Sequence, residues 1–343
     1  IRLDAIAYLW KEIGTSCIHL PQTHRVIQLM RAVLDEAAPH VMLITETNVP
    51  HADNISYFGD GTNEAQLVYN FALPPLVLHS LATGNAEKLT QWAQSLTLPS
   101  DQVTFFNFLA SHDGIGLNPA RGILTGAEID TLVERAVAHG GFVSYKHNPD
   151  GSKSPYELNI NYFDALSEPL SNEPIATQIK RFIVAHAIML SLAGVPGIYF
   201  HSLFGSRGDR DGAEASGIPR RINRQRLLRR ELEEHLPDAS SLRARVFSAF
   251  KGPLHERRMN RAFHPQGWQH VIETDCRVFG LVRVSPDGTE PALCLHNVTG
   301  ERVRLAVHLD EESKQRLART RLPSVIERIL EPYEAAWITA DRT

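Results

Sequence analysis

The stretch HVMLITET (residues 40–47) carries four apolar residues in succession and ends in polar ones. Continuous apolar strands are typical of parallel sheets that helices cover, whereas strands with one wet face alternate apolar and polar residues. The stretch VTFFNFLASHDG (103–114) repeats the pattern of an apolar strand with a polar end. The sequence therefore predicts an α/β fold built on a parallel sheet.

Segments with helical periodicity lie between these strands. In QTHRVIQLMRAVLDEAAP (22–39), apolar residues recur at three- and four-residue steps, with Thr23 as the predicted N-cap and Pro39 as the stop. Further helices are predicted through Leu78 and within 87–96, 127–141 and 174–194. About five strand–helix units result, near residues 1, 41, 67, 103 and 197.

This alternation, with polar residues at the C-terminal ends of the strands, indicates a (β/α)8 barrel, whose active site forms at those ends. Eight units close such a barrel, so five form only a part of one. The alternative is an open doubly wound sheet, but the sequence lacks the glycine-rich phosphate-binding turn of that fold. After the strand predicted in PGIYFHS (196–202), the segment 204–226 is rich in Gly and Arg and is interpreted as a long loop.

The pattern changes again towards the C-terminus. Two helices are predicted near 225–236 and 240–262. From about residue 267, apolar and polar residues alternate between turn signals such as PDG and NVTG in HVIETD, VFGLVRVSPDG, PALCLHNVTG, RVRLAVHL and EAAWITA. This is typical of a small antiparallel β-domain. The predicted domains are thus a partial barrel at 1–265 and a β-domain at 266–343.

Composition narrows the class of protein. The 343 residues are 43% hydrophobic and 22% charged, as in an ordinary globular protein. A net charge of −4, with no basic stripe outside one arginine-rich segment, argues against nucleic-acid binding. Three widely spaced cysteines argue against a disulfide framework or zinc site and favour a reducing cytoplasm. No apolar run reaches the roughly 18 residues of a membrane span.

Acidic residues follow three of the predicted strands. In the opening strand IRLDA, Arg2 and Asp4 share one face, because side chains alternate with period two. A buried acid beside a guanidinium stays ionised, which suits a nucleophile but equally a plain structural ion pair. Glu46 and Asp113 also follow apolar strands, and the ends of barrel strands meet at one mouth.

A pair of facing carboxylates can cleave a glycosidic bond. One attacks the anomeric carbon, while the other protonates the leaving oxygen and then activates the acceptor. A third acid can favour the distorted, oxocarbenium-like sugar ring. A single acid at a strand end is usually a cap or loop residue, but three at successive positions favour a catalytic site.

The motifs RLDAIAYLWK (2–11), ITETN (44–48) and SHDG (111–114) resemble characteristic regions of the α-amylase superfamily, glycoside hydrolase family 13. Within it, five further stretches resemble the sucrose phosphorylase branch: TETNVPHADNISYFG, VSYK, SPYELNINYFDAL, GVPGIYF and RRINR. That branch includes sucrose, sucrose 6-phosphate and glucosylglycerate phosphorylases. The resemblance extends from residue 1 to about 265. It implies the C-terminal part of a (β/α)8 barrel, from about strand 4 onward, followed by the antiparallel β-domain.

The resemblance also implies roles for the three acids. Asp4 would be the nucleophile that forms a β-glucosyl-enzyme, Glu46 the general acid/base and Asp113 the stabiliser of the transition state. Arg2 and His112 would contact the glucosyl unit, with Arg2 also orienting Asp4.

Three further residues match the branch around the substrate. Arg224, in RRINR, would frame the glucosyl site. Tyr156 and Glu157, in SPYELN, match the loop where relatives contact the leaving group or phosphate.

The implied activity is that of a retaining α-glucoside phosphorylase, which uses inorganic phosphate as a substrate and needs no cofactor or metal. Phosphate requires positive charge nearby, which the segment 205–224 would supply. Arg220 and Arg221 in that segment are explained equally well as solvated residues. The rivals are a hydrolase or transglucosylase with the same three acids, and a catalytically silent carbohydrate-binding relative.

The acceptor and the assembly stay open at this point. Sucrose, sucrose 6-phosphate and glucosylglycerate are all candidate donors, with an anionic acceptor slightly favoured. Lys146 or His147 would then provide an additional cation near Tyr156. The partners expected are a small sugar substrate and phosphate, with no nucleic acid or membrane, and the oligomeric state is undetermined.

The position of the nucleophile motif at residue 1 carries a further expectation. By the resemblance, roughly 170 to 220 residues with the first three barrel strands precede it in the family. The 343 residues alone are therefore expected to be a poorly active fragment.

Overall fold

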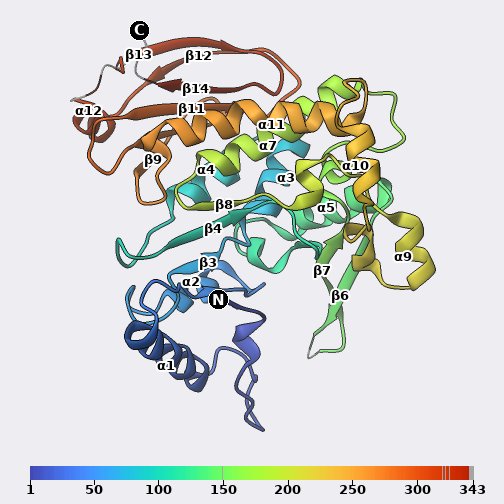
Figure 1. The fold of residues 1–343 in the computed structure, drawn as a ribbon, viewed down its shortest axis with the longest axis vertical. Coiled ribbons are helices and arrows are strands. Elements are labelled where there is room, and N and C mark those ends of the chain that lie inside the picture. The colour runs from blue at the N-terminus through green and yellow to red at the C-terminus, as the bar shows by residue number, and fades with distance from the viewer. Residues whose placement is uncertain (149, 319, 321, 324, 340–343) are drawn as a thin grey trace.

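A computed structural model describes residues 1–148, 150–318, 320, 322–323 and 325–339. Its central sheet has five parallel strands in the order β1-β2-β3-β4-β8. They are β1 (Arg2–Leu3), β2 (Ile44–Thr45), β3 (Leu67–Tyr69), β4 (Thr104–Phe108) and β8 (Val195–Gly197). These strands confirm the five predicted units. Because the strand order never reverses, the sheet has no switch point of the doubly wound kind and curves as part of a barrel instead (Figure 1).

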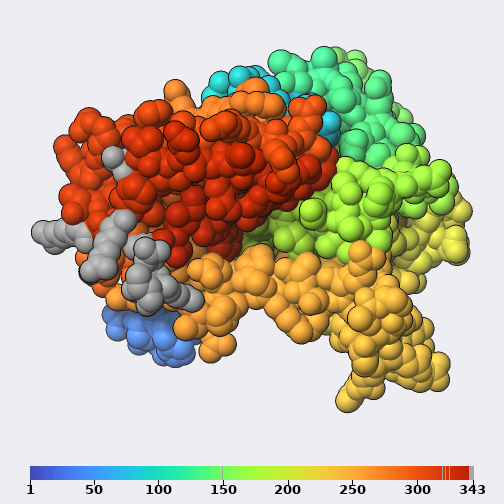
Figure 2. Space-filling view, turned by 90° about the horizontal axis from the view of Figure 1, so that it is seen from above, coloured from blue at the N-terminus to red at the C-terminus, as the bar shows by residue number. Residues whose placement is uncertain are grey.

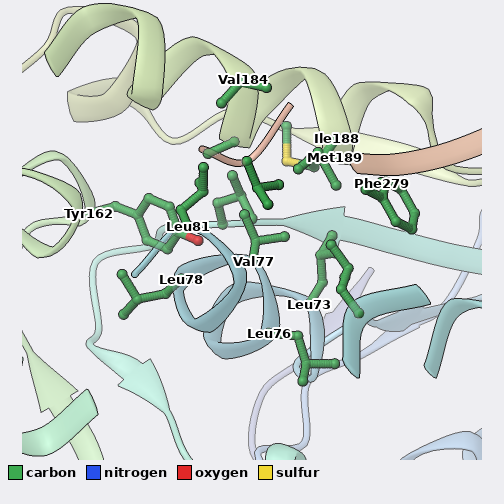
Figure 3. Close-up of a cluster of buried hydrophobic side chains, with 14 of the residues drawn as sticks. Leu73, Leu76, Val77, Leu78, Leu81, Tyr162, Val184, Ile188, Met189 and Phe279 are labelled. Carbon is green, nitrogen blue, oxygen red and sulfur yellow. The ribbon is translucent and has the colours of Figure 1, made fainter. Parts of the chain in front are cut away.

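Helices cover the sheet. They are α1 (Pro21–Ala37), α2 (His51–Ile55), α3 (Leu73–Thr83), α4 (Glu87–Gln94), α5 (Gly126–Ala138), α6 (Tyr162–Leu166) and α7 (Ile175–Ser191). Of these, α3 to α7 contribute side chains to the main core. Helix α3 is buried along most of its length, because Val77 and Leu81 lie on its side towards Val184 and Ile188 of α7, whereas Leu76 points into the core on the opposite side (Figure 3). A helix that is apolar on most sides is expected inside a large core rather than at its surface.

The predicted N-cap of α1 is wrong by three residues. Leu20 is the N-cap, and Pro21 occupies the first helical turn, where its missing N–H and fixed φ fit best. Thr23 lies inside the helix and is buried, and its Oγ1 accepts a hydrogen bond from the Trp10 amide at 3.3 Å. The hydroxyl therefore ties the loop after β1 to the helix instead of capping it.

A second sheet is inserted between β4 and β8, and the sequence analysis missed it. It has the order β5-β7-β6, with β5 (Ile115–Gly116), β6 (Phe142–His147) and β7 (Lys153–Asn159) paired antiparallel. The β6–β7 hairpin projects from the body beside the end of the parallel sheet (Figure 1). It carries the SPYELN motif on β7.

The segment interpreted as a long loop is partly helical. Helix α9 (Arg210–Ser216) is capped by the Asp209 side chain, which accepts from the Gly212 amide at 3.2 Å. It ends at Gly217, which has φ 65°, a conformation that glycine adopts at little cost. The η4 turn (Pro219–Asn223) follows. Upstream, β8 is shorter than predicted, because Phe200–Leu203 form α8.

The C-terminal part consists of α10 (Arg229–His235), α11 (Leu242–Met259) and two β-sheets. One sheet has the order β14-β11-β10-β9, with β9 (Trp268–Ile272), β10 (Val278–Val284), β11 (Pro291–Asn297) and β14 (Ala335–Thr339); the other pairs β12 (Val303–His308) with β13 (Val325–Leu330). Both lie beside α11 on one face (Figure 2). Strand β13 and helix α12 (Glu311–Leu317) were not predicted, and Ala340, the predicted end of the last strand, lies outside the described residues.

The sheets after Trp268 confirm the antiparallel pattern, whereas the domain boundary at residue 265 stays a prediction. The largest core crosses it, since Phe279 of β10 packs with the α3 and α7 side chains (Figure 3). Cys17, Cys276 and Cys294 form no disulfide. In the described part of the chain, no helix is long and apolar enough to cross a membrane.

Candidate active site

The carboxyl ends of the parallel strands open into a pocket of about 270 Å³. The structure brings seven of the eight predicted site residues to its wall: Arg2, Asp4, Glu46, His112, Asp113, Tyr156 and Glu157. Arg224, the eighth, is not part of the wall but contacts Asp113. The acids predicted at separate strand ends therefore meet at one place.

The chain turns sharply after β1, which sets the geometry of the first acid. Ala5 has a left-handed conformation with φ 47°, uncommon for a residue with a Cβ. Arg2 Nη1 lies 2.5 Å from Asp4 Oδ1, and its Nε donates to the Tyr69 hydroxyl at 3.2 Å. The Asp4 side chain is 71% exposed within this chain, and it pairs with Arg2 as the alternation of side chains suggested.

Glu46 has the opposite environment. Its side chain is only 16% exposed, and burial raises its pKa above the ordinary glutamate value. Two contacts oppose burial by favouring the charged form: the Ala5 amide donates to Oε2 at 3.0 Å, and Arg2 Nη2 lies 4.0 Å from Oε1. A carboxyl group that keeps its proton to a higher pH than usual is suited to general acid chemistry.

Asp113 is held by the segment that follows α9. Its Oδ1 accepts from Arg224 Nη2 at 2.8 Å and lies 3.2 Å from Arg220 Nη1, while its backbone carbonyl accepts from Asn223. The His112 ring is half exposed, 3.7 Å from Asp113. Gly114 lets this loop pass close to β7, since a Cβ there would lie 2.4 Å from the Leu158 carbonyl oxygen. Asp113 is thus fixed by long-range contacts.

The β7 strand supplies Tyr156 and Glu157. The Glu157 side chain is only 2% exposed and accepts two hydrogen bonds from Arg220, at 2.9 and 2.8 Å. These hydrogen bonds raise the pKa of Arg220. Burial raises the pKa of the Tyr156 hydroxyl, and the neighbouring Glu157 charge adds to the effect. Arg220, for which the sequence left solvated and phosphate-binding roles open, is therefore part of the pocket wall.

The segment 205–224 does not offer a set of free cations. Each of its five arginines lies within 4 Å of a carboxylate: Arg207 of Asp164, Arg210 of Glu214, Arg220 of Glu157 and Asp113, Arg221 of Asp209, and Arg224 of Asp113. Lys146 and His147 are exposed on β6 and lie outside the pocket wall. Neither residue reaches the pocket wall, so the role of either one as a cation for an anionic acceptor stays a prediction.

Aromatic residues form one wall of the pocket, and the sequence analysis missed them. Tyr69 lies 5.3 Å from Phe108 between ring centroids, and Phe71 lies 5.1 Å from Phe108. All three line the pocket. The available signal was their position towards the ends of the strands predicted near residues 67 and 103.

No group of three His, Cys, Asp or Glu side chains that could hold a metal ion exists among the described residues. The expectation of a cofactor-free site stays a prediction.

Solved structures define the class of fold. Sucrose 6F-phosphate phosphorylase from Thermoanaerobacter thermosaccharolyticum superposes with a TM-score of 0.71 at 21% identity, covering 87% of this chain and 56% of that one. The α-amylase from H. orenii gives a TM-score of 0.63 at 14% identity, covering 99% of this chain and 60% of that one. The fold is therefore the α-amylase type, with the C-terminal part of a (β/α)8 barrel followed by antiparallel sheets, as predicted.

Sequence comparison identifies the branch. No protein-family model matches the chain. Glucosylglycerate phosphorylase from Allomeiothermus silvanus is 50% identical over 339 residues, which are 98% of this chain and 59% of that protein. This similarity confirms the resemblance to the sucrose phosphorylase-like branch of the α-amylase superfamily. The chain spans about half the length of the curated relatives it matches, between 50% and 59% for three of them.

Proposed function

We propose that the natural protein containing this chain is a retaining α-glucoside phosphorylase, which transfers a glucosyl unit to inorganic phosphate. The observation that carries the proposal is the meeting of Asp4, Glu46 and Asp113 at one pocket, each from the end of a parallel strand. The similarity to curated glucosylglycerate phosphorylases supports glucosylglycerate as the donor.

The first displacement forms the enzyme-bound intermediate. A carboxylate oxygen of Asp4 bonds to the anomeric carbon as the bond from that carbon to the leaving oxygen breaks, and Glu46 gives its proton to that oxygen. The raised pKa of Glu46 supports its role as the acid. Arg2 lies 2.5 Å from Asp4 and 4.0 Å from Glu46, which keeps both reacting groups beside one guanidinium.

The second displacement releases the product. A phosphate oxygen bonds to the anomeric carbon, the bond to Asp4 breaks, and α-glucose 1-phosphate leaves. Two inversions give net retention. Asp113 would stabilise the positive charge that develops on the sugar ring in both steps, and its contacts with Arg220 and Arg224 support a fixed position for it.

The test measures product and intermediate separately. The natural protein is incubated with glucosylglycerate, sucrose or sucrose 6-phosphate, with and without phosphate, and glucose 1-phosphate and free glucose are quantified. Phosphate-dependent glucose 1-phosphate is expected, with glucosylglycerate as the best donor; free glucose alone would favour the hydrolase. A fluorinated glucosyl donor should label Asp4, and an unlabelled Asp4 would overturn the double displacement.

A further inference from the structure

Arg220 joins two carboxylates that come from different parts of the fold. Its Nε and Nη2 donate to the two oxygens of Glu157 on β7, 63 residues away in sequence, at 2.9 and 2.8 Å. Its Nη1 lies 3.2 Å from Asp113 Oδ1, in the loop after β4. A bidentate pair of this kind fixes both the position and the orientation of the carboxylate.

The two carboxylates depend on Arg220 to different degrees. Asp113 has a second arginine, Arg224, at 2.8 Å. Among the described residues, no other group donates to the Glu157 carboxylate, whose side chain is 2% exposed. A buried carboxylate that loses its partner retains the cost of desolvation without the compensating attraction. Removal of Arg220 should therefore disturb Glu157 far more than Asp113.

The arrangement also limits what Arg220 can bind. Its guanidinium already faces two carboxylates, so it does not serve as a free cation for an anionic ligand. The oxygens of a carboxylate such as that of Glu157 can only accept hydrogen bonds. The groups of a ligand that face this wall of the pocket are therefore hydrogen-bond donors, such as the hydroxyls of a sugar or polyol.

We propose that Arg220 is a positioning residue for the acceptor: it fixes Glu157 against the pocket so that this carboxylate can accept hydrogen bonds from acceptor hydroxyls. The inference rests on the proposed function, because it needs an acceptor that is distinct from the glucosyl unit. It assigns a task to an arginine that contacts no reacting atom.

The test separates acceptor binding from glucosyl handling. The natural protein containing this chain is supplied with α-glucose 1-phosphate, and transfer to glycerate is compared with slow hydrolysis in the absence of an acceptor. In Arg220→Gln, the KM for glycerate should rise about tenfold or more, and this factor should exceed any loss of acceptor-free hydrolysis, since Arg224 still holds Asp113. Arg220→Lys, which keeps the positive charge, should raise the KM for glycerate less than Arg220→Gln does.

The chain offers a matched control. Arg221 is adjacent and similarly exposed, 36% against 39%, but pairs with Asp209 outside the pocket wall. Arg221→Gln should leave the KM for glycerate within about twofold of the parent value. In Arg220→Gln/Glu157→Gln, the KM should be no higher than in Glu157→Gln alone, because the two side chains act as one unit.

Three results would overturn the inference: an unchanged KM in Arg220→Gln, an equal loss of transfer and hydrolysis, or additive losses in the double variant. If Arg220→Gln does not fold, Arg220→Lys with and without Glu157→Gln gives the same comparison. Failure of the proposed function would look different, because the parent protein itself would then form no glucose 1-phosphate from a glucoside and phosphate.

Discussion

Two arginines each lie between two carboxylates of the pocket, in contrasting surroundings. The Arg2 bridge contains Arg2, Asp4 and Glu46, and the Arg220 bridge contains Arg220, Asp113 and Glu157. The arginines themselves are similarly exposed, at 35% and 39%. Their partners differ, because the Asp4 side chain is 71% exposed whereas the Glu157 side chain is 2% exposed.

The difference matches what each bridge is proposed to do. An exposed carboxylate can leave its guanidinium at little cost, since water replaces the lost contact. This suits the nucleophile of the proposed mechanism, because its carboxylate must rearrange as it bonds to the sugar. A buried carboxylate cannot do so cheaply, which suits a group that only holds a ligand in place. Within this chain, which spans about half the length of its curated relatives, the Arg2 bridge is therefore open to water and the Arg220 bridge is enclosed.

The largest expected effect comes from the reacting carboxylate. Asp4→Asn keeps the size of the side chain but removes the nucleophilic charge, and phosphorolysis should fall on the order of 10⁴-fold. Initial rates of glucose 1-phosphate formation measure the loss. Asp35→Asn is the control, because Asp35 is also an exposed aspartate with an arginine partner, Arg31 at 2.9 Å, but lies on α1 away from the pocket wall. Activity of Asp4→Asn close to that of the control would contradict the assignment.

Loss of the arginine should lower the free energy of unfolding more in the Arg220 bridge than in the Arg2 bridge, although the largest loss of activity is expected in the Arg2 bridge. Arg220→Met leaves Glu157 buried without its partner and should lower the free energy of unfolding by about 2–3 kcal/mol. Arg2→Met removes the contact with the exposed Asp4, the hydrogen bond to Tyr69 and the 4.0 Å contact with Glu46, but leaves no fully buried carboxylate, and should cost less, about 1 kcal/mol. Urea denaturation of the two variants and the parent protein compares them directly. Equal losses would show that burial of the partner does not separate the bridges.

The Arg2–Asp4 pair could be predicted from the sequence and the Arg220–Glu157 pair could not, because the two pairs differ in the number of residues that separate their members. Arg2 and Asp4 are two residues apart, so the alternation of side chains along a strand was enough to pair them. Arg220 and Glu157 are 63 residues apart on an η turn and an inserted strand. Their pairing depends on how β7 and the segment after α9 pack together, which no local pattern records.

The same reason separates the predicted fold from the missed parts. Apolar runs that are buried on both faces identified the parallel strands without further information. The β5-β7-β6 sheet was missed because Pro155 and mixed polarity in SPYELN give no period of two, and its strands form through pairing with one another. Helix α9 was missed although Asp209 and Gly217 are typical cap residues, since its seven residues show no apolar periodicity.

The pH dependence of the reaction should distinguish the bridges by a smaller effect. Glu46 must hold its proton to act as the acid, so kcat/KM should fall as pH rises through its pKa, which burial raises above the ordinary value. Arg2 favours the charged form and so lowers that pKa. Arg2→Met should therefore move the alkaline limb of the profile to higher pH, even as the rate falls.

Arg220→Gln serves as the comparison for that profile. Arg220 is not among the largest causes of the raised pKa of Glu46, so the alkaline limb of the Arg220→Gln profile should move less than that of Arg2→Met. A limb that moves equally in both variants would mean that the limb does not report Glu46.

The smallest expected effect concerns two cations outside both bridges. Lys146 and His147 are exposed on the β6–β7 hairpin and do not line the pocket, and exposed charges at a distance are screened by salt. In Lys146→Ala and His147→Ala, the KM for glycerate should stay within about twofold of the parent value, against about tenfold for Arg220→Gln. An increase as large as that of Arg220→Gln would assign the recognition of an anionic acceptor to the hairpin. It would also mean that the hairpin closes over the pocket when the acceptor binds, because neither side chain reaches the wall as the fold stands.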